Sequence, residues 1–474
     1  MPNSDLRDKM KDLVMELDSR GIRPLYEQIY NYIKEEIRSG KLLYQEKLPS
    51  TRSLAEYLQV SRSTVDLAYE QLLSEGYIES RPYKGFFVCQ VEELYDLKDA
   101  MERGEERTED GQARFQYDFS PNIVELSSFP FGTWKKITKE TLTDDRKEMF
   151  ALGHPQGDIQ LRRTICHYLH TSRGVNCLPE QIIVGAGNDY LLLLLEKILG
   201  RHRSVALENP TYKRAYQIFD SFAYQVRTIP MDRNGISVDA LERSGADLAY
   251  VMPSHQFPTG IVMPIGRRLE LLRWAAGQEG RYLIEDDYDS EFRYRGKPIP
   301  SLQASDRMGK VIYIGTFSKA IAPAIRISYM VLPGELLECY RQNYRFFSST
   351  VSRIDQSILD VFIREGAFER HLNKMRKIYK SRHDCLLSAC KRYLKNITIS
   401  GENAGLHLLL HYRGKRAEEE LIRLASERGV RVYGVSETYI GRLPENWQPT
   451  LILGYAGLDE KDIESGVRIL SDCI

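Results

Sequence analysis

The sequence lacks the closely spaced cysteine and histidine motifs that are typical of disulfide frameworks and zinc sites. Its 474 residues include seven cysteines and nine histidines, with no Cys-x-x-Cys pair and no His-Glu-x-x-His motif. Because such frameworks normally show as closely spaced cysteines, the sequence predicts neither of them. His167 and His170 share one face of a predicted helix, but no acidic ligand is in step with them, so we expect no metal site there.

Net charge and long apolar runs are also missing. The 66 basic and 66 acidic residues cancel, so the whole chain has no attraction to nucleic acid or membranes, although a local patch is still allowed. The run YLLLLLEKIL at 190–199 is too short to span a bilayer and predicts a buried helix. The first twenty residues are charged throughout and lack the apolar core of a signal peptide. We therefore expect a cytoplasmic protein without a membrane partner.

The composition changes along the chain, which indicates more than one domain. Short helical patterns fill the first ninety residues, and strand-like apolar runs alternate with amphipathic stretches after about residue 180. The segment 91–117 is rich in charge and poor in branched apolar residues, as exposed linkers are. We therefore predict a first domain at 1–90, a linker at 91–117 and a larger domain at 118–474.

The first ninety residues predict three helices and a hairpin. Pro24 precedes a helix whose isoleucines and leucine recur every four residues from Leu25 to Ile37. Ser50 can cap a second helix through Leu58, and after a turn of about three residues Ser61 can cap a third through Leu73. Two helices joined by so tight a turn form a helix-turn-helix, and YIESRPYKGFFV then reads as a wing.

The third helix has the side chains to read a major groove with its N-terminal end. The candidate DNA contacts are Ser61, Arg62, Ser63 and Thr64 on this helix, Arg52 one helix earlier, and Arg81 and Lys84 on the wing. A small helical interaction module is the alternative, because residues 20–90 hold about ten basic and nine acidic side chains.

The stretch LPSTRSLAEYLQVSRSTVDLAYEQLLSEGYIESRPYKGFFV resembles the winged helix of GntR-type regulators. The match covers about 65 residues and follows the family's pattern of L-P-S-x-R-x-L-A, V-S-R-x-T-V, L-x-x-E-G-x-I and G-x-F-V. The resemblance implies double-stranded operator DNA as a partner. It also implies that the residues near DNA are Arg52, Arg62, Ser63, Thr64, Lys84 and Gly85.

Five apolar runs after residue 180 each end in a polar or glycine-containing cluster. They are QIIVGAGND, SVALENPTYKR, LAYVMPSHQFPTG, RYLIEDDYD and VIYIGTFSK. Strands alternating with amphipathic helices predict an α/β fold with a mostly parallel sheet covered on both faces. Ligands bind outside the carboxyl ends of such strands, where all five clusters fall.

The clusters offer an anion site and groups suited to an aromatic ring. Backbone amides of Gly187 and Asn188 at a helix start can hold a phosphate, and Thr316, Ser318 and Arg326 can close around the same anion. Asp286 ends a buried strand and needs a cationic or N–H partner, which a protonated ring nitrogen would supply.

Two tyrosines and a lysine complete the set of candidate ligand-binding groups at the strand ends. Tyr288 can hydrogen-bond a phenolate-like oxygen if the strand continues, and Tyr212 can stack on a ring. Lys319, placed on the last strand, is an amine nucleophile that can form a Schiff base. Together these groups describe a site for pyridoxal 5'-phosphate, with a nucleotide-binding doubly wound domain as the alternative.

From about residue 118 onward the chain resembles fold type I aminotransferases. The motifs are PQGDIQLRR, ENPTYKR, HQFPTG, EDDYDSEFRY and the spacing from Ser318 and Lys319 to Pro323 and Arg326. The resemblance implies that Lys319 carries the internal aldimine, with Asp286 at the pyridine nitrogen, Tyr288 at the ring hydroxyl and Tyr212 on the ring. It also implies a small domain at roughly 340–474 and a homodimer.

The two halves together resemble the MocR/GabR subfamily of GntR-type regulators, but three positions depart from the enzyme pattern. Phe257 stands where aminotransferases carry the asparagine of Asn-Pro-Thr-Gly, so His255 or Gln256 would have to replace it. Ile452 aligns with the carboxylate-binding arginine, and Leu152 with a tyrosine lent by the partner subunit. Arg214 and Arg431 are alternative carboxylate ligands, and surface ion pairs are the other explanation for both arginines.

The sequence thus predicts a transcription regulator that senses an amino compound, such as an amino acid or a GABA-like molecule, through an external aldimine. One alternative is a working aminotransferase with a tethered DNA-binding domain. Another is a vitamin B6 sensor whose DNA binding follows the cofactor itself.

Overall fold

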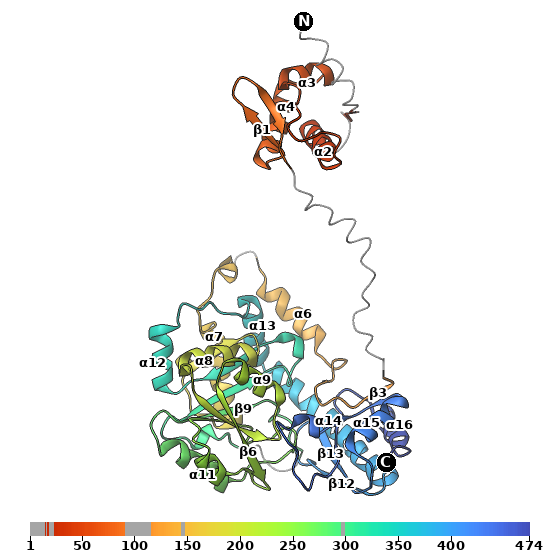
Figure 1. The fold of residues 1–474 in the computed structure, drawn as a ribbon. Helices are drawn as coiled ribbons and strands as arrows, with labels where there is room; N and C mark the ends of the chain where they lie inside the picture. The colour runs from red at the N-terminus through yellow and green to blue at the C-terminus, as the bar shows by residue number, and fades with distance from the viewer. Residues whose placement is uncertain (1–14, 16, 19–22, 91–114, 144–146, 295–298) are drawn as a thin grey trace. The chain divides into compact units, whose positions relative to one another are not determined.

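The computed structural model describes residues 15, 17–18, 23–90, 115–143, 147–294 and 299–474. The chain divides into two compact units, Met1–Gln112 and Ala113–Ile474 (Figure 1). Most of the predicted linker lies outside the described residues. None of the helices in the described ranges combines the length and apolar character that crossing a bilayer requires.

The first unit contains three helices and one hairpin. They are α2 (Leu25–Arg38), α3 (Thr51–Leu58), α4 (Arg62–Ser74), β1 (Ile78–Arg81) and β2 (Gly85–Val88). Ser50 and Ser61 cap α3 and α4 by accepting from the backbone N–H groups of Ser53 and Thr64 at 3.1 and 3.2 Å. Both predicted caps and the three-residue turn are therefore confirmed.

The apolar faces of these helices form one small core. Ile29, Ile33 and Ile37 of α2 are buried against Val65 and Leu72 of α4. The Tyr69 hydroxyl at the centre donates to the carbonyl of Pro49 at 3.0 Å. The period of four that predicted α2 is therefore the period of its buried face.

An eight-stranded sheet organises the second unit, in the order β4-β11-β10-β9-β8-β5-β6-β7. The strands are β4 (Ile182–Gly185), β5 (Ser204–Asn209), β6 (Gln225–Asp232), β7 (Gly235–Ile236), β8 (Leu248–Val251), β9 (Tyr282–Asp287), β10 (Val311–Thr316) and β11 (Ser328–Val331). The strands β10, β9, β8, β5 and β6 pair in parallel. The five predicted apolar runs are β4, β5, β8, β9 and β10 of this sheet.

Helices cover both faces of this sheet (Figure 1). One face packs on α8 (Asn188–Leu199), α9 (Lys213–Ser221) and α12 (Gly334–Asn343). The other packs on α7 (Ile159–Arg173), α10 (Val238–Arg243) and α11 (Ile265–Ala276). Successive strand residues alternate between the two cores, as Leu207 and Ala206 do, which explains why the strands read as continuous apolar runs.

The C-terminal part of this unit forms a smaller antiparallel sheet, β12-β13-β16-β15. Its strands are β12 (Ile397–Ser400), β13 (His407–Tyr412), β15 (Tyr433–Gly434) and β16 (Thr450–Gly454), and β14 (Val430–Arg431) pairs separately with β3 (Tyr117–Asp118). The remaining helices are α6 (Phe131–Thr141), α13 (Arg353–Arg364), α14 (Ala367–Tyr393), α15 (Glu418–Glu427) and α16 (Glu460–Leu470).

Three details differ from the sequence prediction. Lys319 does not lie on a strand, because β10 ends at Thr316 and the lysine follows in a turn. That strand is not the last of the sheet either, since β11 comes next in the chain and inserts antiparallel between β10 and β4. Tyr288 also lies just beyond the end of β9, so strand alternation does not set its direction.

Candidate functional site

A cavity lies at the carboxyl ends of the parallel strands and gathers the predicted cofactor residues. All nine line it: Gly187, Asn188, Tyr212, Asp286, Tyr288, Thr316, Ser318, Lys319 and Arg326. Arg214, the first predicted effector ligand, lines it as well. Side chains from four separate strand ends therefore meet at one place, as expected for ligands of an open α/β sheet.

Lys319 is partly buried and places its amine in this cavity. Its Nζ donates to the carbonyl of Pro121 at 2.9 Å. Burial lowers the pKa of Lys319 to about 8, and the nearby Asp289 carboxylate opposes that shift. An amine with this pKa is unprotonated in about a tenth of molecules at pH 7, far more than an ordinary lysine, and the unprotonated amine is the nucleophile.

Asp286 is buried on the α8 side of β9. The Tyr250 hydroxyl and the Asn188 amide, at 3.4 Å, donate to its carboxyl group. Burial raises the pKa of Asp286 to about 7, and the neighbouring Asp287 and Asp289 add to the effect. A cation placed against this carboxyl would reverse that shift, because an opposite charge favours the ionised form.

Tyr288 and His255 form a second polar group beside the lysine. His255 Nδ1 lies 3.0 Å from the Tyr288 hydroxyl and 2.9 Å from Asp289 Oδ2. Burial raises the pKa of Tyr288 well above its usual value, so its hydroxyl keeps its proton and can donate. His255 Nε2 is buried with no hydrogen-bond partner among the described residues.

An anion cradle is built at the start of α8. Gly187 caps this helix with φ 92°, and a Cβ added there would lie 2.3 Å from Arg326 Nη2, so only glycine fits. The Thr316 hydroxyl accepts from the Ser318 N–H at 3.2 Å and lies 2.9 Å from the Ser328 hydroxyl. Helix N–H groups, hydroxyls and a guanidinium thus surround one small volume.

Asp189 balances the positive charge of this cradle. Its Oδ2 lies 2.5 Å from Arg214 Nη2 and 3.3 Å from Arg326 Nη2. Half of each arginine side chain is exposed, so both guanidinium groups can exchange this carboxylate for another anion.

The small-domain side of the cavity is apolar or neutral. Phe257 and His407 line it, with their rings 5.5 Å apart, and the Tyr212 ring meets Phe257 edge-on at 6.1 Å. Burial lowers the pKa of His407 to about 3, so the ring is neutral. Ile452 is 2% exposed and packs in an apolar cluster with Leu409 and Val435.

Two of the sequence-derived alternatives, Arg431 and Gln256, lie away from the cavity, and Leu152, aligned with the tyrosine lent by a partner subunit, is exposed in the single chain. Arg431 is absent from the described lining of the cavity and faces Asp118 at 3.8 Å instead. The Gln256 side chain is committed to Pro210 and Thr259, and it does not line the cavity. Leu152 is 92% exposed.

Several residues of the site had no signal in the sequence. Tyr250 comes from a neighbouring strand, His407 from the small sheet, and Pro121 from the segment after β3. Asp289 had a weak signal, since it follows Tyr288 in the acidic run EDDYD. Tyr250 lies in the apolar part of the run LAYVMPSHQFPTG, outside its polar cluster, whereas His407 and Pro121 are far from the motifs in sequence, so only the fold brings these two residues to the cavity.

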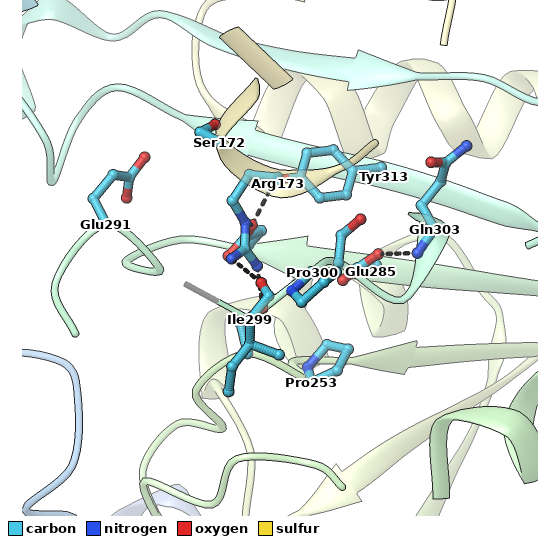
Figure 2. Close-up of polar contacts among 12 residues, drawn as sticks. Ser172, Arg173, Pro253, Glu285, Glu291, Ile299, Pro300, Gln303 and Tyr313 are labelled. Carbon is cyan, nitrogen blue, oxygen red and sulfur yellow. Dashed lines mark hydrogen bonds and ion pairs between the residues drawn. The ribbon is translucent and has the colours of Figure 1, made fainter. Parts of the chain in front are cut away.

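Beneath Asp286, on the opposite face of β9, lies a buried ionic network. Arg173 Nε donates to Asp287 Oδ2 at 2.7 Å, and the Tyr313 hydroxyl donates to the same oxygen at 2.5 Å. The guanidinium also reaches the Ile299 carbonyl, and Glu285 accepts from the backbone of Gln303 at 2.9 Å (Figure 2). The network ties the end of α7 to the strand that carries Asp286.

Most predicted DNA contacts of the helix-turn-helix unit are exposed, and Thr64, Arg81 and Gly85 are half-buried. Arg52 and Arg62 are 80% and 70% exposed and, among the described residues, form ion pairs with Glu56 and Asp66 on their own helices. Ser61 has a second role as a cap, and its hydroxyl also lies 2.8 Å from that of Ser63 and 2.7 Å from that of Thr64. Lys84 and Gly85 lie at the turn of the β1–β2 wing, where Gly85 has φ 102°.

Family comparisons match both units. The family of bacterial regulatory proteins called gntR matches residues 25–88, and aminotransferase class I and II matches residues 121–470. Domains of the second family typically bind pyridoxal phosphate. The chain is therefore a helix-turn-helix transcription regulator with an aminotransferase-like domain of fold type I, and its helix-turn-helix implies DNA binding.

Relatives that match over nearly the whole chain define the class of transcription regulator more closely. The transcriptional regulator YdeL of Bacillus subtilis is 41% identical over 94% of this chain and 96% of its own length. The regulatory protein MocR of Rhizobium meliloti is 33% identical over 96% and 94%. The pyridoxine biosynthesis regulator PdxR of Corynebacterium glutamicum is 28% identical over 98% and 99%. The chain belongs to the MocR-type regulators.

Solved structures agree on the fold of the larger unit. An archaeal alanine:glyoxylate aminotransferase is similar with a TM-score of 0.68 and 25% identity, over 79% of this chain and 94% of that one. A kynurenine aminotransferase of Pyrococcus horikoshii has a TM-score of 0.67 and 24% identity, over 81% and 94%.

Proposed function

We propose that this regulator holds pyridoxal phosphate on Lys319 and changes its DNA binding when an amino compound occupies the same cavity. The observation that carries the proposal is the buried Lys319 amine, which lines one cavity with the Gly187–Arg326 cradle and the Asp286 carboxyl group. Each of these features is costly by itself, since it buries a charge or requires a glycine. One ligand with an aldehyde, an anion and a basic ring would satisfy all three.

The residues present fit that cofactor. The cradle would hold its phosphate, Asp286 its ring nitrogen, Tyr288 its ring oxygen and Tyr212 one face of its ring. The buried and unpartnered Asn188 Oδ1 and His255 Nε2 also leave polar atoms for a ligand to satisfy. When bound, the cofactor supplies an aldehyde carbon that exchanges one amine for another.

Lys319 and Pro121 provide a route from the cavity to the chain that leads to the first unit. The lysine amine donates to the Pro121 carbonyl, and Pro121 follows β3, the first described strand after the linker. An effector amine that displaces Lys319 from the cofactor would change the hydrogen-bond partner of the Lys319 amine. The effector shifts the equilibrium only by as much as its affinities for the two states differ.

Arg214 is the proposed ligand for an effector carboxylate. It lines the cavity, and its partner Asp189 also contacts Arg326, so a cofactor phosphate and an effector anion would both compete for these guanidinium groups. Arg431 would have to leave Asp118 and turn toward the cavity to act as a second ligand.

Sensing is favoured over turnover by the small-domain side of the cavity. Phe257 and the cluster around Ile452 put apolar groups where an arginine would anchor an amino acid in the enzymes that this domain resembles. An aminotransferase activity would instead require keto product to accumulate over many turnovers. A vitamin B6 sensor would respond to the cofactor and ignore amines, a role that the pyridoxine biosynthesis regulator among the relatives makes worth testing.

We also propose the boundaries and assembly of the chain. The winged helix occupies 1–90, a linker 91–117 and the effector domain 118–474, with a small subdomain from about 340. The effector domain pairs as a homodimer and binds an operator as such.

The test compares wild type and Lys319→Ala for absorbance and for DNA binding. Wild type should take up pyridoxal phosphate with a new band near the violet edge of the visible range, and borohydride should fix the label on Lys319. Candidate amines should then change wild-type affinity for duplexes selected from a random pool, and leave the variant unchanged. Absence of uptake would refute the cofactor. Uptake with DNA binding that ignores every amine would favour the B6 sensor.

A further inference from the structure

A cluster of two thiols and one imidazole lies at the end of α7, outside the cavity described above. Cys166 and His170 are four residues apart on this helix, which places them on one face. Gly174 ends the helix in the left-handed conformation with φ 66°, and the chain then turns back along it. Cys177 is thereby brought beside the other two residues.

The three side chains converge on one point. Cys166 Sγ lies 3.8 Å from His170 Nε2 and 3.9 Å from Cys177 Sγ. One donor atom from each of the three residues falls within 4.8 Å of the others. Among the described residues, no other group of cysteine, histidine and acidic side chains meets this distance criterion.

These separations are close to those of a tetrahedral zinc site. With Zn–S bonds of about 2.3 Å, two thiolates on one tetrahedral ion lie roughly 3.8 Å apart. The thiols need almost no movement to reach that spacing, and the imidazole, which lies within 4.8 Å of both sulfur atoms, must move closer to them. Two sulfur ligands with one nitrogen ligand suit Zn²⁺ better than the hard cations Mg²⁺ and Ca²⁺.

Burial distinguishes this cluster from a chance surface group. Cys166 and Cys177 are 6% and 3% exposed, whereas His170 is exposed. The thiols would form the protected side of the site and the imidazole its rim, leaving a fourth position open to water. The Cys177 carbonyl lies 3.2 Å from Cys166 Sγ and 2.9 Å from His170 Nε2, and the Cys177 N–H lies 3.4 Å from the same nitrogen. These contacts hold the three residues together through the atoms that would bind the metal, so Zn²⁺ would replace them.

We infer that Cys166, His170 and Cys177 form a Zn²⁺ site that joins the end of α7 to the segment before β4. On binding, the two thiols lose their protons to solvent and become thiolate ligands, and the neutral imidazole contributes its lone pair. No electrons are transferred. Binding weakens as the pH falls, because protons compete for the same sulfur atoms.

This site escaped the sequence analysis because its spacing is Cys-x₃-His-x₆-Cys, with the third ligand beyond the end of a helix. A search for Cys-x-x-Cys pairs does not detect it, and the pairing of His167 with His170, considered from the sequence without an acidic ligand in step, does not include the two cysteines. The proposed metal would also lie close in sequence to Arg173, which holds Asp287 beneath the cofactor strand.

The experiment uses the full chain, freed of pyridoxal phosphate and dialysed against a chelator. We expect one equivalent of Zn²⁺ by mass spectrometry after reloading. Co²⁺ should give a thiolate-to-metal charge-transfer band and the strong visible bands of a tetrahedral ion. Cys166→Ser and Cys177→Ser should each weaken Zn²⁺ binding by more than the roughly 10- to 100-fold that an outer-shell change costs.

Two further variants separate the loss of a zinc ligand from misfolding and from the loss of any buried thiol. His170→Gln changes an exposed side chain, so it should fold normally and still weaken Zn²⁺ binding. Cys390→Ser alters a buried thiol of α14 and should leave Zn²⁺ binding unchanged. Retention of Zn²⁺ by His170→Gln and by both cysteine variants would overturn the assignment. So would wild type that takes up no Zn²⁺ and instead oxidises to a Cys166–Cys177 disulfide.

Discussion

At the scale of single residues, the cavity collects groups whose ordinary chemistry is altered by burial. Burial lowers the pKa of the Lys319 amine and raises the pKa of the Asp286 carboxyl. Both shifts favour the neutral form, as expected of charges in a medium of low polarity. A cofactor that brings a cationic ring nitrogen would restore the charge on Asp286.

The raised pKa of Asp286 predicts how the stability of the cofactor-free protein depends on pH. Its pKa of about 7 in the folded state lies above the ordinary value of 3.8, so the folded state binds more protons than the unfolded state between these values. The free energy of unfolding should therefore fall as the pH rises from about 4 to 7, by at most about 4 kcal/mol from this group.

Urea unfolding of wild type and Asp286→Asn at pH 5 and pH 8 measures this effect. Asparagine resembles the protonated acid and does not ionise, so the variant should lose less stability between the two pH values. Equal losses in both proteins would show that Asp286 is not the titrating group. Other buried carboxyl groups with raised pKa values, such as Glu208 and Glu285, are present in both proteins and cancel in the comparison.

At the scale of elements, helix ends and strand ends carry both proposed functions. The first turn of α4 presents Arg62 to solvent, and the first turn of α8 forms the anion cradle. In both cases a capping residue starts the helix where its N–H groups are exposed.

Arg62→Ala should weaken DNA binding without unfolding the winged helix. The side chain is 70% exposed and its ion pair within the described part of the chain is with Asp66 on the same helix, so its loss costs little stability. We expect about 1–3 kcal/mol lower affinity if it contacts a base, or a smaller salt dependence if it contacts a phosphate. Titrations of a selected duplex at several salt concentrations measure both, with Arg38→Ala at the end of α2 as the matched control.

An unchanged affinity and salt slope for Arg62→Ala would contradict the groove model for α4. A loss of similar size for Arg38→Ala would mean that the effect is one of net charge.

Arg173→Ala should loosen the attachment of α7 to β9. The guanidinium is 5% exposed and pairs with the buried Asp287 carboxylate, so removing it leaves an uncompensated charge at a cost of about 3–5 kcal/mol. Urea unfolding of the cofactor-free chain measures this cost. Arg163→Ala removes an exposed arginine of the same helix and should change stability little. A cost below about 1 kcal/mol for Arg173→Ala would show that the network is dispensable.

At the scale of the whole molecule, assembly is the main prediction. Large apolar side chains near the start of the second unit face solvent in the single chain, among them Phe150 at 75% and Leu152 at 92% exposure. Apolar groups so exposed and so close together are typical of a surface that another chain covers.

Leu152→Asp should therefore favour the monomer. Burying a carboxylate at a subunit interface is unfavourable, so the dimer dissociation constant should rise roughly tenfold or more, equivalent to about 1.4 kcal/mol. Light scattering over a range of concentrations measures this change. Met308→Asp is the control, because this 68% exposed side chain lies before the first residue of β10, at the end of the sheet away from the cavity. Equal dissociation of both variants would show that Leu152 is not part of the interface.

The elements and their chemistry could be predicted from the sequence because their signals are local. The isoleucines of α2, the serine caps of α3 and α4, and the five apolar runs each depend on residues a few positions apart. Lys319, Asp286 and Gly187 stood at strand ends, and parallel strands bring such ends to one edge. That geometry is general, so nine candidate ligands could be named without coordinates.

Only the tertiary structure decided which distant groups join them. It showed that Tyr250 donates to Asp286, that Pro121 accepts from Lys319 and that His407 closes the small-domain side. It also removed Arg431 from the cavity lining and placed Cys177 beside Cys166 and His170. These relations depend on how helices and sheets pack across hundreds of residues, and no short-range periodicity encodes them. The local sequence thus determined the kinds of groups at the site, and the packing of the chain determined their partners.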